Sequence, residues 1–551
     1  MKKVILYTLL IALYYSCNQE KKHETASVAT TFDFDWEAAN IYFLLTDRFN
    51  NGDTSNDINF ERNKETGKLR GFEGGDIKGI TQKIEEGYFT ELGVNAIWMT
   101  PVVEQIHGGT NEGTGLTYGF HGYWTKDWTS IDPNYGTKED LKALVEIAHA
   151  NGIRILLDAV INHTGPVTEV DAVWPDSWVR TEPQCQYQDY KSTITCTLVK
   201  NLPDIKTESD EAVELPPQLL EKWKSEGRYE EEVAELDAFF DRTGHPRAPR
   251  FYIMKWLSDY ITEFGIDGYR VDTVKHVEEN VWQEFRVECD YAFAKWKEKH
   301  PERVLDDSGF YLVGEVYNYG ISGAKNFDFG DTKVNYYDDA FNSLINFEFK
   351  WNAQQQQYEE VFNRYSKIMD GELNSYSVVN YLSSHDDGQP FDPNRERPMV
   401  TANYLLMAPG ASQIYYGDEL ARSLVVEGTV GDATLRSNMN WDSMDTNSEI
   451  LAHWQKLGRF RAKHPAVGAG VHQIISQQPY TFYRSYYQDN KNDLVVVGLE
   501  MNKGEKQIDV SELFEDGITL FDAYSGQEIE VKNGNATLSS DYEYVLLEKN
   551  E

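Results

Sequence analysis

Acidic side chains follow several apolar, strand-like runs in this sequence. Asp158, Asp272, Glu315 and Asp386 each come after such a run, and Arg270 stands two residues before Asp272. Two neighbouring carboxyl groups, one ionised and one protonated, can serve one reaction as base or nucleophile and as acid. A single acidic residue at a strand end is more often a helix cap or half of an ion pair. The prediction of a catalytic site therefore requires that these residues lie together.

Eight strand-like runs alternate with helical patterns and could bring the acidic residues to one place. The runs are Ile41–Leu45, Ala96–Met99, Ile153–Leu157, Gly268–Val271, Tyr311–Val313, Ser343–Phe347, Ser377–Leu382 and Ser412–Tyr416. Apolar residues at helical spacing predict helices over 137–152, with Thr137 as N-cap, and over 251–265. We therefore predict an α/β fold, a (β/α)8 barrel, whose chemistry lies at the carboxyl ends of its strands.

The barrel is expected over residues 32–162 and 250–465, with an inserted domain over 163–249 after the third strand. From about Ala466 the pattern changes to short alternating runs, and Asn533 and Gly534 mark a turn. This pattern predicts a C-terminal antiparallel β-sandwich domain over 466–551.

The composition is that of an ordinary globular protein with a strong negative charge. The 551 residues include 52 Lys and Arg against 90 Asp and Glu, a formal net charge of −38. This charge repels phosphate backbones and anionic lipid, so we expect no nucleic-acid partner. Neutral ligands and divalent cations remain compatible with it.

The N-terminal segment is typical of an export signal. Lys2 and Lys3 precede an apolar run from Val4 to Tyr15, which is too short to span a bilayer, and Ser16 and Cys17 follow. A Cys after a small residue resembles the bacterial lipobox, in which Cys17 would carry a lipid. An ordinary signal peptide with an incidental Cys is the alternative. We expect a signal peptide over 1–17, a tether over 18–31, and an exported protein that is anchored to a membrane only by lipid, in the outer membrane or periplasm, or else secreted.

Two cysteines in the inserted segment are candidates for a disulfide. Cys185 and Cys196 lie in a polar stretch, and export to an oxidising compartment would allow them to pair. Two free, buried thiols are the alternative.

Together, these motifs resemble the α-amylase family of glycoside hydrolases, family 13, over the whole mature chain. The residues that carry the resemblance are Asp158 to His163, Gly268 to His276, Gly314 to Val316, Ser384 to Asp386, Leu202 to Ile205, Thr46 to Asp53 and Gly417 to Glu419. The resemblance implies Asp272 as nucleophile, Glu315 as acid and base, and Asp386 as the third carboxylate, which grips the distorted sugar. It implies sugar contacts for His121, Tyr123, His163, Arg270, Lys275, His276 and His385.

The resemblance also implies two Ca²⁺ sites built from oxygen donors. The first would use Asn51, Asp53, Asn56, Asp57, Gly74 and Asp76. The second would use Asn162, Asp204 and the carbonyl of His276. An Asx-rich turn without metal is the alternative for the first.

The function implied is retaining hydrolysis of α-1,4-glucosidic bonds in starch, glycogen or maltooligosaccharides. A transglycosylase of the cyclodextrin glucanotransferase type and a non-catalytic glycan-binding relative are the alternatives. The glucanotransferases place an aromatic residue four positions before the Asp matched by Asp204, where this chain has Lys200, and they usually carry further C-terminal domains. The intact Asp272, Glu315 and Asp386 argue against the non-catalytic alternative.

Overall fold

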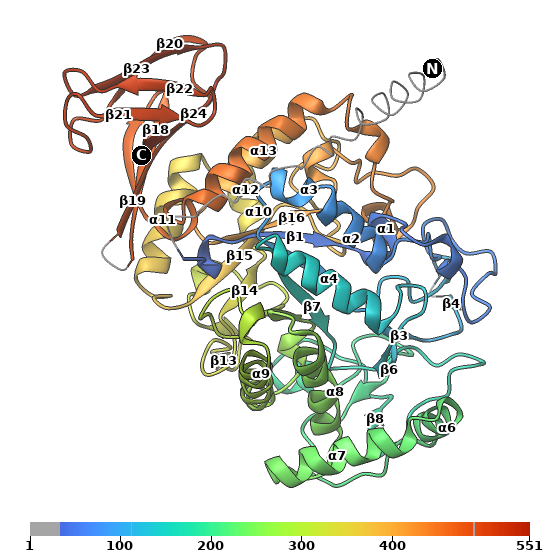
Figure 1. The fold of residues 1–551 in the computed structure, drawn as a ribbon. Helices are drawn as coiled ribbons and strands as arrows, with labels where there is room; N and C mark the ends of the chain where they lie inside the picture. The colour runs from blue at the N-terminus through green and yellow to red at the C-terminus, as the bar shows by residue number, and fades with distance from the viewer. Residues whose placement is uncertain (1–32, 112, 489–490, 551) are drawn as a thin grey trace, which may run out of the picture. The chain divides into compact units, whose positions relative to one another are not determined.

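Eight parallel strands close into a barrel in the computed structural model, which describes residues 33–111, 113–488 and 491–550 (Figure 1). The predicted signal peptide, the tether and Cys17 lie outside the described residues. Around the barrel the strands follow the order β1-β16-β15-β14-β11-β10-β7-β2. Their bounds are β1 (Asn40–Leu44), β2 (Ala96–Met99), β7 (Arg154–Ala159), β10 (Gly268–Val271), β11 (Tyr311–Gly314), β14 (Ser343–Asn346), β15 (Ser377–Tyr381) and β16 (Ala411–Tyr415). The predicted barrel is thus confirmed, and each predicted strand overlaps one of the eight.

Helices cover the barrel strands, whose residues are buried along their whole length. A parallel strand that is buried on both faces tends to have a largely apolar sequence, which is why these strands could be predicted from the sequence. The helices of the barrel are α1 (Thr46–Phe49), α2 (Ile77–Glu85), α3 (Tyr88–Glu91), α4 (Lys138–Ala150), α8 (Pro249–Phe264), α9 (Glu279–Lys299), α10 (Phe349–Gln355), α11 (Tyr358–Asp370), α12 (Pro398–Met407) and α13 (Ser448–Lys463). In α4, Thr137 and Asp140 form a capping box, as the sequence position of Thr137 suggested.

Short 3-10 helices lie in the connecting segments. They are η1 (Trp36–Ala38), η2 (Thr54–Asn56), η3 (Val274–His276), η4 (Pro301–Arg303), η5 (Ile321–Gly323), η6 (Asp418–Leu420), η7 (Gly431–Leu435) and η8 (Trp441–Ser443). Of these, η3 follows β10 directly and carries Lys275 and His276 to the mouth of the barrel.

The loops after β2 and β11 contain small antiparallel pairs. Those after β2 are β3 (Val103–Gln105) with β6 (Thr125–Ile131), and β4 (Thr110–Asn111) with β5 (Leu116–Thr117); the pair after β11 is β12 (Phe327–Asp328) with β13 (Lys333–Val334). Between β7 and α8 the insertion holds β8 (Val179–Arg180), α5 (Lys191–Ile194), β9 (Asp204–Ile205), α6 (Pro217–Glu226) and α7 (Tyr229–Thr243).

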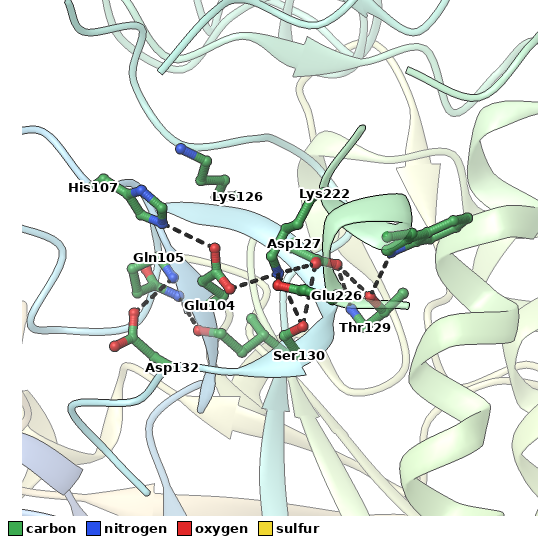
Figure 2. A network of polar contacts seen from close by, with 12 residues as sticks. Glu104, Gln105, His107, Lys126, Asp127, Thr129, Ser130, Asp132, Lys222 and Glu226 are labelled. Carbon is green, nitrogen blue, oxygen red and sulfur yellow. Dashed lines mark hydrogen bonds and ion pairs between the residues drawn. The ribbon is translucent and has the colours of Figure 1, made fainter. Parts of the chain in front are cut away.

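A buried polar network fastens the insertion to the barrel. Figure 2 shows Lys222 of α6 reaching the β3–β6 hairpin, where its Nζ donates to Glu104 Oε2 at 2.6 Å, to Asp127 and to Ser130 Oγ at 3.0 Å. Because both carboxylates are buried, removing the Lys222 charge would deprive each of its shortest ion pair, and Asp127 would keep the longer one to Arg228 at 3.3 Å. The network therefore favours one fixed position of the insertion on the barrel.

The C-terminal region is antiparallel β structure with a core of its own. Its elements are α14 (Ala466–Ala469), β17 (Val471–Gln477), β18 (Tyr480–Gln488), β19 (Lys491–Leu499), β20 (Gly504–Asp509), β21 (Thr519–Asp522), β22 (Gln527–Glu530), β23 (Asn535–Ser540) and β24 (Val545–Lys549). A six-stranded sheet, β17-β18-β19-β24-β21-β22, and the pair β20-β23 share one cluster of buried side chains. Two sheets that enclose one core form a sandwich. Within the part of the chain that is described, no helix has the length and apolarity that crossing a bilayer requires.

Candidate active site

One buried arginine organises the carboxylates at the mouth of the barrel. Arg270 Nη1 donates to Asp272 Oδ1 at 2.7 Å and to both oxygens of Asp158 at 3.0 and 3.1 Å. Its Nη2 lies 3.3 Å from Glu315 Oε2. Three strands, β7, β10 and β11, are neighbours in the barrel and end at the same edge, so their acidic residues share one guanidinium.

Glu315 is buried and is held in its protonated form. Burial and the negative charges of Asp272 and Asp386 raise its pKa to about 8, against the lowering effect of Arg270. Its Oε2 accepts the backbone N–H of Thr273 at 2.8 Å. A carboxyl group with this pKa remains protonated at neutral pH and can act as a general acid.

Asp158 shares Arg270 with Asp272 and was not assigned a role from the sequence. Besides Arg270, it accepts hydrogen bonds from Tyr123 Oη at 2.8 Å and Trp98 Nε1 at 3.1 Å. Burial raises its pKa to about 7, with Arg270 acting in the opposite direction. These contacts make Asp158 a positioning residue for both Arg270 and Tyr123.

Three aromatic rings form one wall of the site. The ring of Tyr123 stacks on His385, with centroids 5.2 Å apart and planes 23° apart, and on His121 at 5.8 Å and 22°. The backbone N–H of Tyr123 donates to His121 Nδ1 at 3.1 Å, so the imidazole proton of a neutral His121 resides on Nε2. Burial lowers the pKa of both histidines well below the ordinary value, which keeps them neutral.

His163 uses its ring nitrogens within the protein. Its Nε2 donates to the backbone carbonyl of Tyr123 at 3.1 Å, and its Nδ1 lies 3.4 Å from Asn162 Nδ2. Burial lowers its pKa. In this geometry His163 supports the position of Tyr123, and its contact with a sugar stays a prediction.

The opposite side of the site is formed by η3 and the loop after β11. Lys275 Nζ donates to the carbonyl of Tyr317 at 3.1 Å and lies 5.1 Å from the ring centroid of the same residue. His276 Nδ1 lies 2.9 Å from the carbonyl oxygen of Thr193 in the insertion. Asp386 is the most open of the site carboxylates, with 36% of its side chain exposed, whereas Asp272 and Glu315 are buried.

The arrangement can carry out acid-assisted nucleophilic displacement. It combines an arginine-paired aspartate, a protonated glutamic acid on the next strand and neutral donors with flat aromatic faces, which suit a polyhydroxylated, uncharged substrate.

The catalytic-domain model of the α-amylase family matches residues 43–467, which span the barrel and the insertion. The chain belongs to the α-amylase family. A periplasmic α-amylase of Escherichia coli is 35% identical over 528 residues, which cover 85% of this chain and 73% of that protein.

Solved structures of the α-amylase family share the fold. An α-amylase from Geobacillus thermoleovorans in complex with acarbose superposes with a TM-score of 0.63 at 22% identity, covering 94% of this chain and all of that one. CldA, described as a cyclomaltodextrin glucanotransferase with a three-domain ABC distribution, superposes with a TM-score of 0.63 at 22% identity. The match covers 93% of this chain and 99% of CldA.

The first cluster expected to bind Ca²⁺ in this family member is brought together in part. Asn51 Nδ2 donates to Asp57 Oδ1 at 2.9 Å, and a Cβ at Gly74, whose φ is +92°, would collide with both side chains. Asp76 caps α2 and accepts N–H groups from Gly52, Asp53 and Gly79, as well as the side-chain amide of Asn56. The carboxylate of Asp53 accepts hydrogen bonds from Lys78 Nζ at 2.6 Å and from Ser55 Oγ, which compete with a metal for this side chain.

The second cluster joins β7, η3 and the insertion. One terminal atom of the Asn162 amide lies 3.2 Å from the carbonyl oxygen of His276 and 3.3 Å from Asp204 Oδ1. Arg180 Nε lies 2.7 Å from Asp204 Oδ2. Among the described residues, no group of three or more His, Cys, Asp or Glu side chains is placed to hold a metal, so both clusters would need amide and carbonyl oxygens besides their carboxylates.

Two further features near the family's catalytic residues were not found from the sequence. Tyr187 and Tyr317 are large apolar rings that are 53% and 47% exposed near η3. Asp387, next to Asp386, forms a largely buried ion pair with Lys350 and accepts Tyr381 Oη at 2.7 Å. No sequence spacing links these residues. Only their position after barrel strands could have suggested them.

Proposed function

We propose that this protein is a retaining α-glucan hydrolase that cleaves α-1,4-glucosidic bonds of starch, glycogen or maltooligosaccharides. The chain is a glycoside hydrolase of the α-amylase family, and the observation that carries the mechanism is the Arg270 guanidinium shared by Asp272 and Glu315. Arg270 donates a hydrogen bond to Asp272 Oδ1, while burial and like charges keep the proton on Glu315.

In the first step, Asp272 Oδ attacks C1 of the sugar and the C1–O bond to the leaving sugar breaks. Glu315 gives its proton to the departing oxygen, and a glycosyl ester forms on Asp272. In the second step, the Glu315 carboxylate takes a proton from water, the water oxygen attacks C1, and the ester bond to Asp272 breaks. Asp386 would hold the hydroxyls of the distorted sugar, and Tyr123 would stack on its face.

The experiment is a reducing-sugar assay on soluble starch with the wild type, Asp272→Asn and Glu315→Gln. Each variant deletes one step of the displacement rather than a packing contact, so we expect turnover to fall at least ~100-fold. A variant that keeps more than about a hundredth of the wild-type turnover would show that its residue does not have the proposed role. The non-catalytic alternative requires an inactive wild type.

We infer that Ca²⁺ occupies the first cluster, and the second cluster is a further candidate. The buried Asn56 Oδ1 has no hydrogen-bond partner in the described structure, and it lies in a loop rich in carboxylate and amide oxygens. In the second cluster, if the atom of Asn162 facing Asp204 is oxygen, three acceptors converge, and oxygens that share one Ca²⁺ at about 2.4 Å lie roughly 3.2 Å apart. A bound Ca²⁺ would brace these loops and would take no part in the displacement.

We further propose that the protein is exported and is held at a membrane by a lipid on Cys17. The N-terminal pattern supports export, as do the oxidised cysteines of the insertion and the likeness to a protein named as periplasmic.

A further inference from the structure

A small covalent loop of the insertion lies against η3. Cys185 and Cys196 are joined by a disulfide, and we call residues 185–196 the disulfide loop. The loop contains α5, whose Thr193 carbonyl accepts a hydrogen bond from His276 Nδ1 at 2.9 Å. The edge of the Tyr187 ring meets the His276 ring at a centroid distance of 5.8 Å.

The same loop touches two other segments at the mouth of the barrel. Tyr190 Oη donates to Glu279 at the start of α9, and the Tyr190 N–H donates to Asp331 Oδ1 at 3.0 Å. The Tyr190 ring meets Phe329 edge-on at 5.1 Å. The disulfide loop therefore bridges the segments that follow β10 and β11, the strands that carry Asp272 and Glu315.

The disulfide loop has little apolar anchoring of its own. Besides the two half-cystines, Ile194 is its one buried hydrophobic side chain, Tyr190 packs partly buried against the core, and most of its other residues are polar. Backbone hydrogen bonds hold the two ends, Cys185 N to Thr197 O and Thr197 N to Pro183 O, both at 2.9 Å. Because so few apolar contacts fix the loop, the covalent link is a principal restraint on its conformation.

The contact with Thr193 fixes the state of the His276 ring. A carbonyl oxygen only accepts, so Nδ1 of a neutral His276 carries the proton and Nε2 keeps a lone pair. The ring is thus fixed in one tautomer and one orientation by a residue inside the disulfide loop. Arg270, Asp272 and Glu315, in contrast, are held by one another and by Asp158 and Thr273.

We propose that the Cys185–Cys196 disulfide is a positioning element for the leaving-group side of the site. By closing the loop it holds the His276 imidazole ready to accept a hydroxyl hydrogen bond from the departing sugar. Opening the disulfide weakens binding of sugar units on that side and leaves bond cleavage itself intact. This proposal rests on the proposed function, in which Glu315 protonates the leaving sugar. The backbone N–H of Val274 in η3 donates to the Glu315 carbonyl at 3.0 Å, so η3 lies on the side of the acid.

The test compares two substrates with the oxidised wild type and the double variant Cys185→Ser/Cys196→Ser. Maltoheptaose places sugar units on both sides of the cleaved bond, whereas 4-nitrophenyl α-maltotrioside cleaved at its aryl bond places none on the leaving side. We expect kcat/KM for maltoheptaose to fall roughly 2- to 12-fold through KM, the range for one hydrogen bond between uncharged groups. Release of nitrophenol should change less than about twofold.

An equal decrease in kcat/KM for both substrates would show a general structural role of the disulfide and would overturn the proposal. An unchanged kcat/KM for both substrates would also overturn it. Dithiothreitol added to the wild type should reproduce the loss on maltoheptaose, and it should leave the double variant unchanged, since the other two cysteines, Cys17 and Cys289, are common to both. If the double variant does not fold, the wild type that is reduced with dithiothreitol after folding takes its place. A reduced wild type, with both thiols confirmed by alkylation, that keeps its KM for maltoheptaose would overturn the proposal. An oxidised wild type inactive on starch would instead refute the proposed function.

Discussion

Replacing Glu315 with glutamine should remove activity and, at neutral pH, stabilise the folded protein. The pKa of Glu315 is raised to about 8 from 4.5, chiefly by burial. Below pH 4 the residue is protonated in both the folded and the unfolded protein. Between the two pKa values the unfolded chain loses its proton first, so the free energy of unfolding decreases as pH rises through this window. Glutamine has no proton to lose and does not show this decrease.

The size of the effect follows from the interval between the unfolded pKa of 4.5 and the working pH of the assay. At pH 7 it amounts to roughly 3 kcal/mol, because each pKa unit corresponds to about 1.4 kcal/mol. For a protein of this length, about 2 cal/mol/K of unfolding entropy per residue converts that value to a rise in Tm of about 3 °C. Glutamine can still accept the N–H of Thr273, so the shape of the site is retained.

The assay is thermal unfolding of the wild type and Glu315→Gln at pH values from 4 to 8. The two melting temperatures should coincide at pH 4 and separate as pH rises, with the variant more stable. Glu302→Gln, which changes an exposed carboxylate, is the matched control and should show no such separation. A gap that is the same at pH 4 and pH 7, or a wild type that is more stable at pH 7, would refute the reasoning about Glu315.

Three further predictions concern the metal, the products and the anchor. Chelation should lower the Tm of the mature protein, because Ca²⁺ that binds only the folded state stabilises it; an unchanged melting curve with no metal by elemental analysis would contradict both calcium assignments. Chromatography of a starch digest should show linear maltooligosaccharides, because the exposed Lys200 offers no ring for a glucan to wrap around; cyclodextrins as the dominant early product would contradict the hydrolase assignment. The protein should fractionate with membranes and Cys17→Ala should release it, whereas soluble wild type would refute lipidation.

The barrel could be predicted from the sequence because its strands are buried on both faces. The run Ala96–Met99 is short, apolar and bounded by polar residues, and Gly268–Val271 is bounded in the same way although it carries Arg270; each proved to be a barrel strand. The C-terminal domain could be predicted because its sheets are buried on one face and exposed to solvent on the other. Apolar and polar residues therefore alternate along its strands. Its expected start at Ala466 instead lies in α14, and the alternating strands begin at Val471.

The contacts within the site could not be read from sequence position. Asp158 was noted as a strand-end residue, but its bonds to Trp98 and Tyr123 join segments that are far apart in the chain. The contact of the Thr193 carbonyl with His276 could not be predicted either, because every residue type has the same backbone oxygen. The ion pair between Lys78 and Asp53, one of the residues expected at the first calcium site, was likewise not predicted, because it joins segments 25 residues apart.

The central claim is that Asp272 forms a covalent bond with the sugar. The most direct test is peptide mass mapping of Glu315→Gln after incubation with α-maltosyl fluoride. Fluoride leaves without acid assistance, so the ester can form, but it is released slowly because no base activates water. The account predicts a maltosyl adduct on the peptide that contains Asp272. An adduct on another carboxylate, or none while fluoride is released, would contradict it.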